Sequence, residues 1–167
     1  MILRIFTDGA CSCNPGPGGW ASVISNYGEC GEYKIISGNE ELTTNNRMEL
    51  MAVLKTLEHL MSGKVEGLSK NDDKIYIHSD SAYVVNAIND NWVTKWKVNK
   101  WKTSKGEDVK NKELWEELVS ILWALVGEGW KIKLIKVKGH AGNVLNELAD
   151  KEARGQSLAA KYKASKI

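Results

Sequence analysis

The sequence lacks several features that would place it in other protein classes. None of its apolar runs approaches the roughly 18 residues of a membrane-spanning helix, and its N-terminus lacks a signal-peptide pattern. Its cysteines, Cys11, Cys13 and Cys30, are odd in number, which argues against a disulfide framework. No second pair of cysteines or histidines completes a zinc site with them. We therefore expect a cytoplasmic protein with reduced cysteines and no membrane partner.

The sequence also lacks an internal repeat and any obvious domain boundary. Its 167 residues suit one domain, and its 43% of hydrophobic and 26% of charged residues are ordinary for a globular protein. We therefore expect a single domain over residues 1–167, and we take the protein to be a monomer. Within it we distinguish a basic segment, residues 92–112, and a C-terminal tail at about 155–167.

Charge is distributed unevenly, although the formal net charge is only +2. Residues 1–91 carry 7 basic and 12 acidic side chains, a net charge of −5, whereas the basic segment carries 7 lysines and a net charge of +5. The same segment contains Trp92, Trp96 and Trp101. Scattered lysines are usually solvated surface, but tryptophan is costly to expose, so this mixture favours a base-stacking surface beside a phosphate track. Because the segment has no periodic apolar face, we expect it to project from the core.

The periodicity of apolar residues predicts an α/β fold. Strand-like patterns occupy five stretches, at 3–7, 20–25, 32–37, 75–78 and 130–134, with a turn at 26–28. Helical spacing occupies four, at 46–61, 83–88, 114–125 and from 145 onward. Thr43 or Thr44 is the expected N-cap of the first helix. This order predicts a mixed five-stranded sheet, with three antiparallel strands followed by parallel strands and with helices on both faces.

Four carboxylates stand at the ends of these predicted elements. Asp8 and Asp80 follow strands, whereas Glu49 and Asp150 stand early in helices. Taken singly, each has a structural explanation as a turn residue, a helix cap or a partner of a helix dipole. Together they favour a site, because sites in open α/β sheets gather at the carboxyl ends of strands. Converging carboxylates need a cation between them, and Mg²⁺ or Mn²⁺ suits such oxygen ligands.

Five blocks of sequence occur in order between residues 3 and 153. They are Phe6–Gly9 with Asn14–Gly19, Thr43–Glu49, Ser79–Val84, Trp92–Asn111 and Val137–Asp150. These blocks resemble the type 1 ribonuclease H family, of the bacterial ribonuclease HI type. The resemblance implies a ribonuclease H-like fold and an enzyme that hydrolyses the RNA strand of RNA–DNA hybrids. It also implies two Mg²⁺ ions in the site, replaceable by Mn²⁺, and products with 5′-phosphate and 3′-hydroxyl ends.

The resemblance further implies roles for individual residues. Asp8, Glu49, Asp80 and Asp150 would be the metal-binding catalytic carboxylates, and His140 would aid proton transfer or product departure. Asn14, Asn45 and Asn46 would contact the RNA strand, and Thr44 and Asn111 would hold a DNA phosphate. The remaining substrate contacts are implied on the DNA strand and in the basic segment, at Tyr83, Trp92, Trp96, Lys97, Lys100, Trp101, Lys102 and Ser104.

Three features depart from the family pattern. Cys13 stands where bacterial members often have glycine, Ala82 replaces a polar residue, and the connection at 62–73 looks longer than usual. Two alternatives stay open. A DNA nuclease of the integrase or transposase kind shares the carboxylates, although the asparagines and the basic segment speak against it. An inactive hybrid-binding module is disfavoured because all four carboxylates are retained.

Overall fold

Five strands form one mixed sheet in the spatial order β3-β2-β1-β4-β5. The structure, a computed structural model, describes residues 2–25, 33–65, 67–138 and 143–166. The strands are β1 (Ile2–Cys11), β2 (Gly16–Ser25), β3 (Tyr33–Thr43), β4 (Lys74–Ser79) and β5 (Lys131–Lys136). The helices are α1 (Asn45–Met61), α2 (Ala82–Asn89), α3 (Trp92–Val98), α4 (Lys112–Gly127) and α5 (Val144–Ser165).

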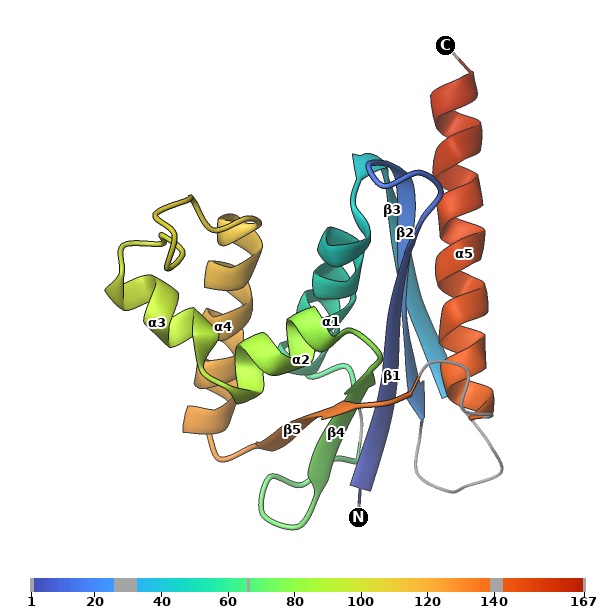
Figure 1. Cartoon of the computed structure of the whole chain (residues 1–167). Coiled ribbons are helices and arrows are strands. Elements are labelled where there is room, and N and C mark those ends of the chain that lie inside the picture. The colour runs from blue at the N-terminus through green and yellow to red at the C-terminus, as the bar shows by residue number, and fades with distance from the viewer. Residues whose placement is uncertain (1, 26–32, 66, 139–142, 167) are drawn as a thin grey trace.

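The predicted mixed sheet is confirmed. The β1–β2 and β2–β3 pairs are antiparallel, whereas the β1–β4 and β4–β5 pairs are parallel. Helices α1 and α5 cover opposite faces of the sheet (Figure 1). Alternation along β1 sends Leu3 and Ile5 into the main core, which also contains α1 and α4, and sends Phe6 toward Ala149 of α5. Thr44 is the N-cap of α1, since its hydroxyl accepts a hydrogen bond from the backbone N–H of Arg47 at 3.2 Å.

The first three strands extend further along the chain than the sequence predicts, and Asp8-Gly9 is not a turn. Instead Asp8 pairs with Ala21 and Gly9 with Trp20, because the antiparallel ladder continues beyond the apolar run. Glycine is required here, since a Cβ on Gly9 would lie 2.4 Å from the backbone nitrogen of Glu49. This close approach brings the first turns of α1 directly against β1. The predicted turn at 26–28 lies outside the described residues.

The basic segment is more ordered and more attached than its pattern suggests. Residues 92–98 form α3, a helix that the sequence analysis did not predict. The segment stands away from the sheet (Figure 1), but Val93 and Val109 are buried in the main core. Trp92, Trp96 and Trp101 are partly buried against the same core. The expectation that the segment simply projects is therefore wrong: its apolar side chains dock it onto α4, while its lysines remain exposed.

Helix α5 extends far beyond its first turns. Residues 155–165, set apart above as a tail, continue the helix to Ser165. Ala153, Ser157 and Ala160 form its buried stripe, which packs against the sheet. No helix in the described part of the chain is long and apolar enough to cross a membrane.

Candidate metal centre and nucleic-acid interface

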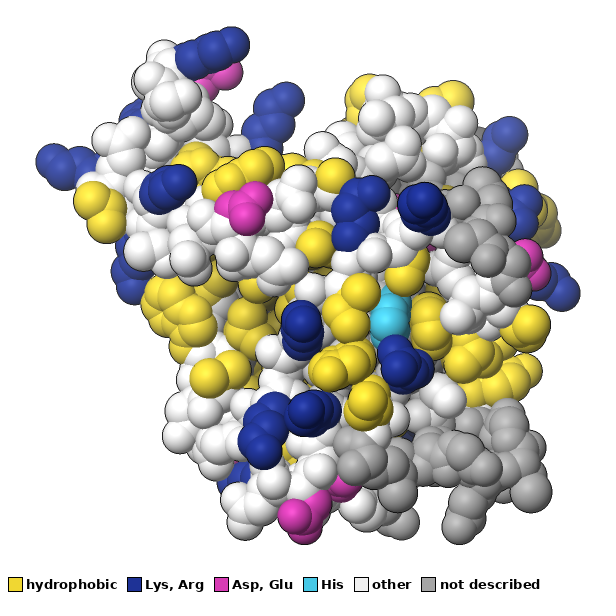
Figure 2. All heavy atoms as spheres, turned by 60° about the horizontal axis from the view of Figure 1, so that its bottom comes forward, with side chains coloured by type: hydrophobic (Ala, Val, Ile, Leu, Met, Phe, Trp, Pro, Cys, Tyr) yellow, Lys and Arg dark blue, Asp and Glu magenta, His cyan; other side chains and the backbone are white. Residues whose placement is uncertain are grey.

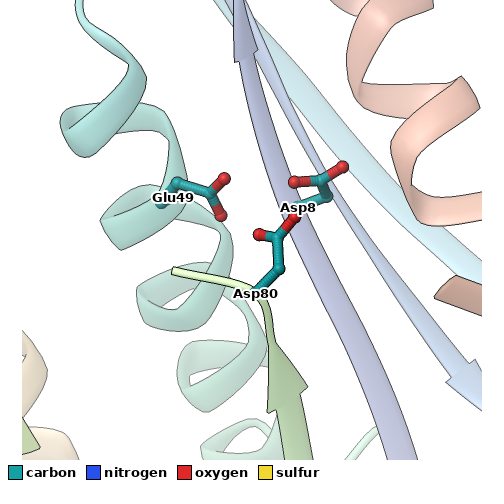
Figure 3. Close-up of side chains that lie close together, drawn as sticks. All are labelled: Asp8, Glu49 and Asp80. Carbon is teal, nitrogen blue, oxygen red and sulfur yellow. The ribbon is translucent and has the colours of Figure 1, made fainter. Parts of the chain in front are cut away.

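Asp8 and Asp80 become neighbours because of the parallel pairing of β1 with β4. The ladder between these strands ends with Thr7 opposite Ser79, and each aspartate is the next residue of its chain segment. Glu49 comes from the second turn of α1, which Gly9 allows to approach β1. One carboxylate oxygen from each of the three residues lies within 4.8 Å of the other two. Figure 3 shows the three side chains converging from a strand, a helix and the end of another strand.

Burial and mutual repulsion both act on this group. Burial raises the pKa of Asp8 to about 7, and the negative charge of Asp80 adds to the rise. Burial also raises the pKa of Glu49 well above its ordinary value, with further contributions from Asp8 and Asp80. Among the described residues, no donor reaches the buried Oε2 atom of Glu49. Crowded carboxylates with an unsatisfied buried oxygen fit a hard divalent cation, which supplies both the missing ligand and the opposing charge.

Asp150 lies at the same site but outside that group of three. Asp150 and the three carboxylates line one cavity of about 430 Å³. The Oδ2 atom of Asp150 pairs with Nη2 of Arg154, one turn later in α5, at 2.9 Å. The sequence analysis did not anticipate this pair, although the spacing of four residues on a helix is its signal.

The cavity also collects polar residues from the three surrounding helices. Its lining includes Asn45, Asn46 and Tyr83, three of the expected substrate contacts. Ser81, Asn146 and Glu147 line it as well, and the sequence analysis gave these three no role. Asn14 lies next to the cavity, because its Oδ1 accepts a hydrogen bond from the backbone N–H of Asn45 at 3.1 Å.

An aromatic cluster connects the cavity to the basic segment. Tyr83 accepts a hydrogen bond from Nε1 of Trp115 at 2.9 Å, and the two rings meet edge to face. Trp96 also packs edge to face on Trp115, with ring centroids 5.7 Å apart, and Trp92 lies against Trp96. Trp115 is fully buried. The sequence did not predict that Trp115 contacts both Tyr83 and Trp96, because a tryptophan on the apolar stripe of a helix is typical of an ordinary core residue.

The remaining expected contacts are spread around this centre. Arg47 joins α1 to α4 by pairing with Glu113 at 2.8 Å, so the helix starts that carry Thr44 and Asn111 lie close together. On the basic segment, four of the expected contacts are exposed to solvent, while Trp101 is half-buried. The exposed residues are Lys97, Lys100, Lys102 and Ser104. His140 lies outside the described residues, and so does Cys30, whereas Cys11 and Cys13 are free thiols.

Known proteins match this chain in sequence and in fold. A sequence profile of the family described as RNase H matches residues 2–157. A protein named ribonuclease H from Caldicellulosiruptor saccharolyticus is 47% identical over 150 residues, which cover 90% of this chain and 92% of that protein. Another ribonuclease H, from Acetivibrio thermocellus, is 48% identical over 151 residues, covering 90% of this chain and 91% of its own.

A solved structure extends this likeness to the fold. The crystal structure of LC9-RNase H1, described as a type 1 RNase H with the type 2 active-site motif, aligns with a TM-score of 0.70 at 28% identity. The alignment covers 93% of this chain and 73% of that one. The mixed sheet with helices on both faces is therefore shared with a ribonuclease H of known structure.

Proposed function

The chain belongs to the ribonuclease H family, and from this membership and its carboxylate site we propose that it hydrolyses the RNA strand of RNA–DNA hybrids. The observation that carries the proposal is the convergence of Asp8, Glu49 and Asp80 within 4.8 Å at the floor of an open polar cavity. Carboxylates placed in this way can hold divalent cations, which stabilise the negative charge that builds on a phosphate and its leaving oxygen in the transition state of phosphodiester cleavage.

The four carboxylates would hold two Mg²⁺ ions, for which Mn²⁺ would substitute. When bound, the ions supply an activated water and stabilise the leaving 3′ oxygen, which leaves 5′-phosphate and 3′-hydroxyl ends. Asp8, Glu49 and Asp80 would provide the closest oxygens, and Asp150 would complete the set once its Oδ2 gave up the contact with Arg154. His140 would assist proton transfer or product departure, a role that follows from the family resemblance alone.

Recognition of the hybrid would divide between two surfaces. Asn45 and Asn46 line the cavity, and Asn14 is hydrogen-bonded to the backbone of Asn45. From these positions the three side chains would contact the 2′-hydroxyls of the RNA strand. The DNA strand would run along the aromatic cluster and the exposed lysines of the basic segment. The contacts assigned to it are Thr44, Tyr83, Trp92, Trp96, Lys97, Lys100, Trp101, Lys102, Ser104 and Asn111.

The test compares three labelled substrates of the same sequence: an RNA–DNA hybrid, a duplex RNA and a duplex DNA. We expect cleavage of the hybrid alone, only with Mg²⁺ or Mn²⁺, and on the RNA strand. Asp8→Asn should reduce turnover below a tenth of wild type while the variant still binds the hybrid, because it removes a metal-binding charge and little volume. Glu41→Gln, which changes an exposed carboxylate on β3 to an amide, is the matched control and should cleave normally.

Two outcomes would reject the proposal. Cleavage of duplex DNA at a comparable rate would indicate a DNA nuclease on the same fold. Tight hybrid binding without turnover in Mg²⁺ and Mn²⁺ would indicate an inactive binding module.

A further inference from the structure

No helix of the described part of the chain covers one side of β4 and β5. This side faces the same way as α5, since Phe6 packs on α5 and pairs with His78 of β4. Among the described elements α5 packs on β1, β2 and β3, whereas α2 lies on the other side of β4 and β5. Figure 2 presents the uncovered side: lysine and arginine side chains lie there among hydrophobic ones around a histidine, and acidic side chains are few.

Two rows of side chains across β1, β4 and β5 form this surface. One row pairs Arg4 with Tyr76 and Tyr76 with Lys133. The row below it pairs Ile2 with Lys74 and Lys74 with Lys131. We call Arg4, Lys74, Tyr76, Lys131 and Lys133 the β4–β5 platform. All four cations are exposed, Tyr76 is partly exposed, and neither row contains an acidic residue.

Arg4 is held in place on the platform. Its guanidinium lies over the ring of Tyr76, 5.6 Å from the centroid, and its Nη1 lies 3.1 Å from Nε2 of His78. His78 in turn stacks on Phe6, with ring centroids 4.6 Å apart and the planes 11° from parallel. The cation and the ring of Tyr76 are therefore presented together by residues that belong to the core.

The platform carries like charges side by side. Lys74 and Lys131 are directly paired across β4 and β5, and like charges placed opposite one another on neighbouring strands repel. Besides this pairing, the Nζ atom of Lys131 donates a hydrogen bond to the backbone carbonyl of Asn71 at 3.2 Å. An anion that binds here would meet four cations and one aromatic ring that lies between two of them. Nucleic acid offers both phosphates and planar bases. A duplex buries the faces of its bases, so only an unpaired strand can stack on Tyr76.

We propose that the β4–β5 platform binds single-stranded nucleic acid, with its phosphates on the lysines and a base stacked on the Arg4–Tyr76 pair. The proposal goes beyond hybrid cleavage and does not depend on it. The platform would hold an unpaired RNA tail next to a hybrid, or the RNA that cleavage releases.

The test measures the binding of a labelled single-stranded RNA by fluorescence anisotropy in EDTA, across a salt titration. Lys74→Ala/Lys133→Ala removes two phosphate contacts from exposed positions. The slope of log affinity against log salt should flatten by about 1.4, which corresponds to a loss of about 25-fold in affinity at 0.1 M salt. Lys161→Ala/Lys166→Ala removes the same charge from the exposed end of α5 and should leave the slope unchanged.

Tyr76→Leu separates stacking from charge. It should weaken RNA binding at least fivefold while the salt slope stays at the wild-type value, because stacking is apolar. If Tyr76→Leu does not fold, the salt slope of Lys74→Ala/Lys133→Ala still tests the proposal. Cleavage of a blunt-ended hybrid by Lys74→Ala/Lys133→Ala should remain at the wild-type rate.

Three results would contradict the proposal that the platform binds single-stranded nucleic acid. One is a wild-type salt slope in Lys74→Ala/Lys133→Ala. Another is displacement of the RNA by polyglutamate or by anionic lipid vesicles at equal charge concentration, which would show a general anion surface. The third is a matching loss of blunt-hybrid cleavage, which would place these lysines in the substrate groove. A wild-type protein that binds RNA in EDTA but never cleaves a hybrid would reject the proposed function and leave the platform intact.

Discussion

Asp8→Asn should stabilise the metal-free protein at about pH 8. The folded state raises the pKa of Asp8 from 3.8 to about 7 through burial and the charge of Asp80. The folded protein therefore binds a proton more tightly than the unfolded chain does, so stability falls as pH rises from about 4 to about 7. A rise of about three pKa units corresponds to about 4 kcal/mol at pH values above both pKa values.

Asparagine removes that charge and keeps the shape. Its Oδ1 can still accept the hydrogen bond that Asp8 accepts from the backbone N–H of Gly9 at 2.9 Å. The amide stays buried, which retains part of the desolvation cost, so we expect a net gain between about 2 and 4 kcal/mol at pH 8. Near pH 4 the carboxyl group is protonated in the folded state, and the gain should nearly vanish.

Urea unfolding followed by circular dichroism measures this difference, in EDTA and in saturating Mg²⁺, at both pH values. Glu41→Gln is the control and should change stability by less than about 0.5 kcal/mol. Saturating Mg²⁺ should shrink the advantage of Asp8→Asn, because the ion stabilises only the folded form that binds it. A metal-free Asp8→Asn protein that is no more stable than wild type at pH 8 would refute the raised pKa of Asp8.

Three other variants test separate parts of the structure. The first variant replaces four exposed lysines of the basic segment with alanine: Lys97, Lys100, Lys102 and Lys105. It should raise KM more than it lowers kcat, and it should flatten the slope of log affinity for the hybrid against log salt by nearly one unit per lost contact. An unchanged slope would show that these lysines are ordinary solvated surface. His140→Ala should slow turnover by about 10²–10⁴-fold without abolishing it, and a loss as complete as that of Asp80→Asn would contradict its assignment. Gly19→Ala should lower the free energy of unfolding by about 1–3 kcal/mol, because its Cβ would lie 2.4 Å from the Cβ of Gln156 on α5; thermal melting at the wild-type temperature would contradict that packing.

Local signals in the sequence predicted most of the fold. The periods of two and of 3.6 residues located all five strands and four of the five helices, and Thr44 was correctly among the predicted caps. The errors arose where pairing partners far along the chain decide the structure. The extension of β1 beyond Thr7 depends on β2, and the glycines at the start of β2 are tolerated in a strand because α1 and α5 pack closely there.

Helix α3 was missed for a related reason. It has only seven residues, and its apolar positions do not repeat long enough to define a period. Its contacts with Trp115 come from a helix that begins 14 residues after it ends, so the docking is visible only in three dimensions. In the sequence, where this docking cannot be seen, three tryptophans among lysines are typical of an exposed stacking surface. The predicted projection of the segment from the core was wrong for this reason.

The carboxylates were easier to find than the surfaces around them. A carboxylate at the end of a strand is a local signal, and the parallel pairing of β1 with β4 follows from the order of the elements. The platform left no such signal. Lys133 and Tyr76 each look like the polar or half-buried residue of an alternating strand, and only the register between β1, β4 and β5 places them beside Arg4.

The proposed metal site depends on the entire fold, because the four carboxylates assigned to it come from β1, α1, the end of β4 and α5. Secondary structure alone does not assemble it: the sheet must form and both flanking helices must dock before the charges meet. Folding therefore buries Asp8 beside the charge of Asp80, and both effects lower the stability of the metal-free protein as pH rises from about 4 to about 7. A bound divalent ion reverses the sign of this contribution. It follows that Mg²⁺ should raise the unfolding midpoint more at pH 8 than at pH 5, since the folded protein holds a proton on Asp8 at pH 5 and has lost most of it at pH 8.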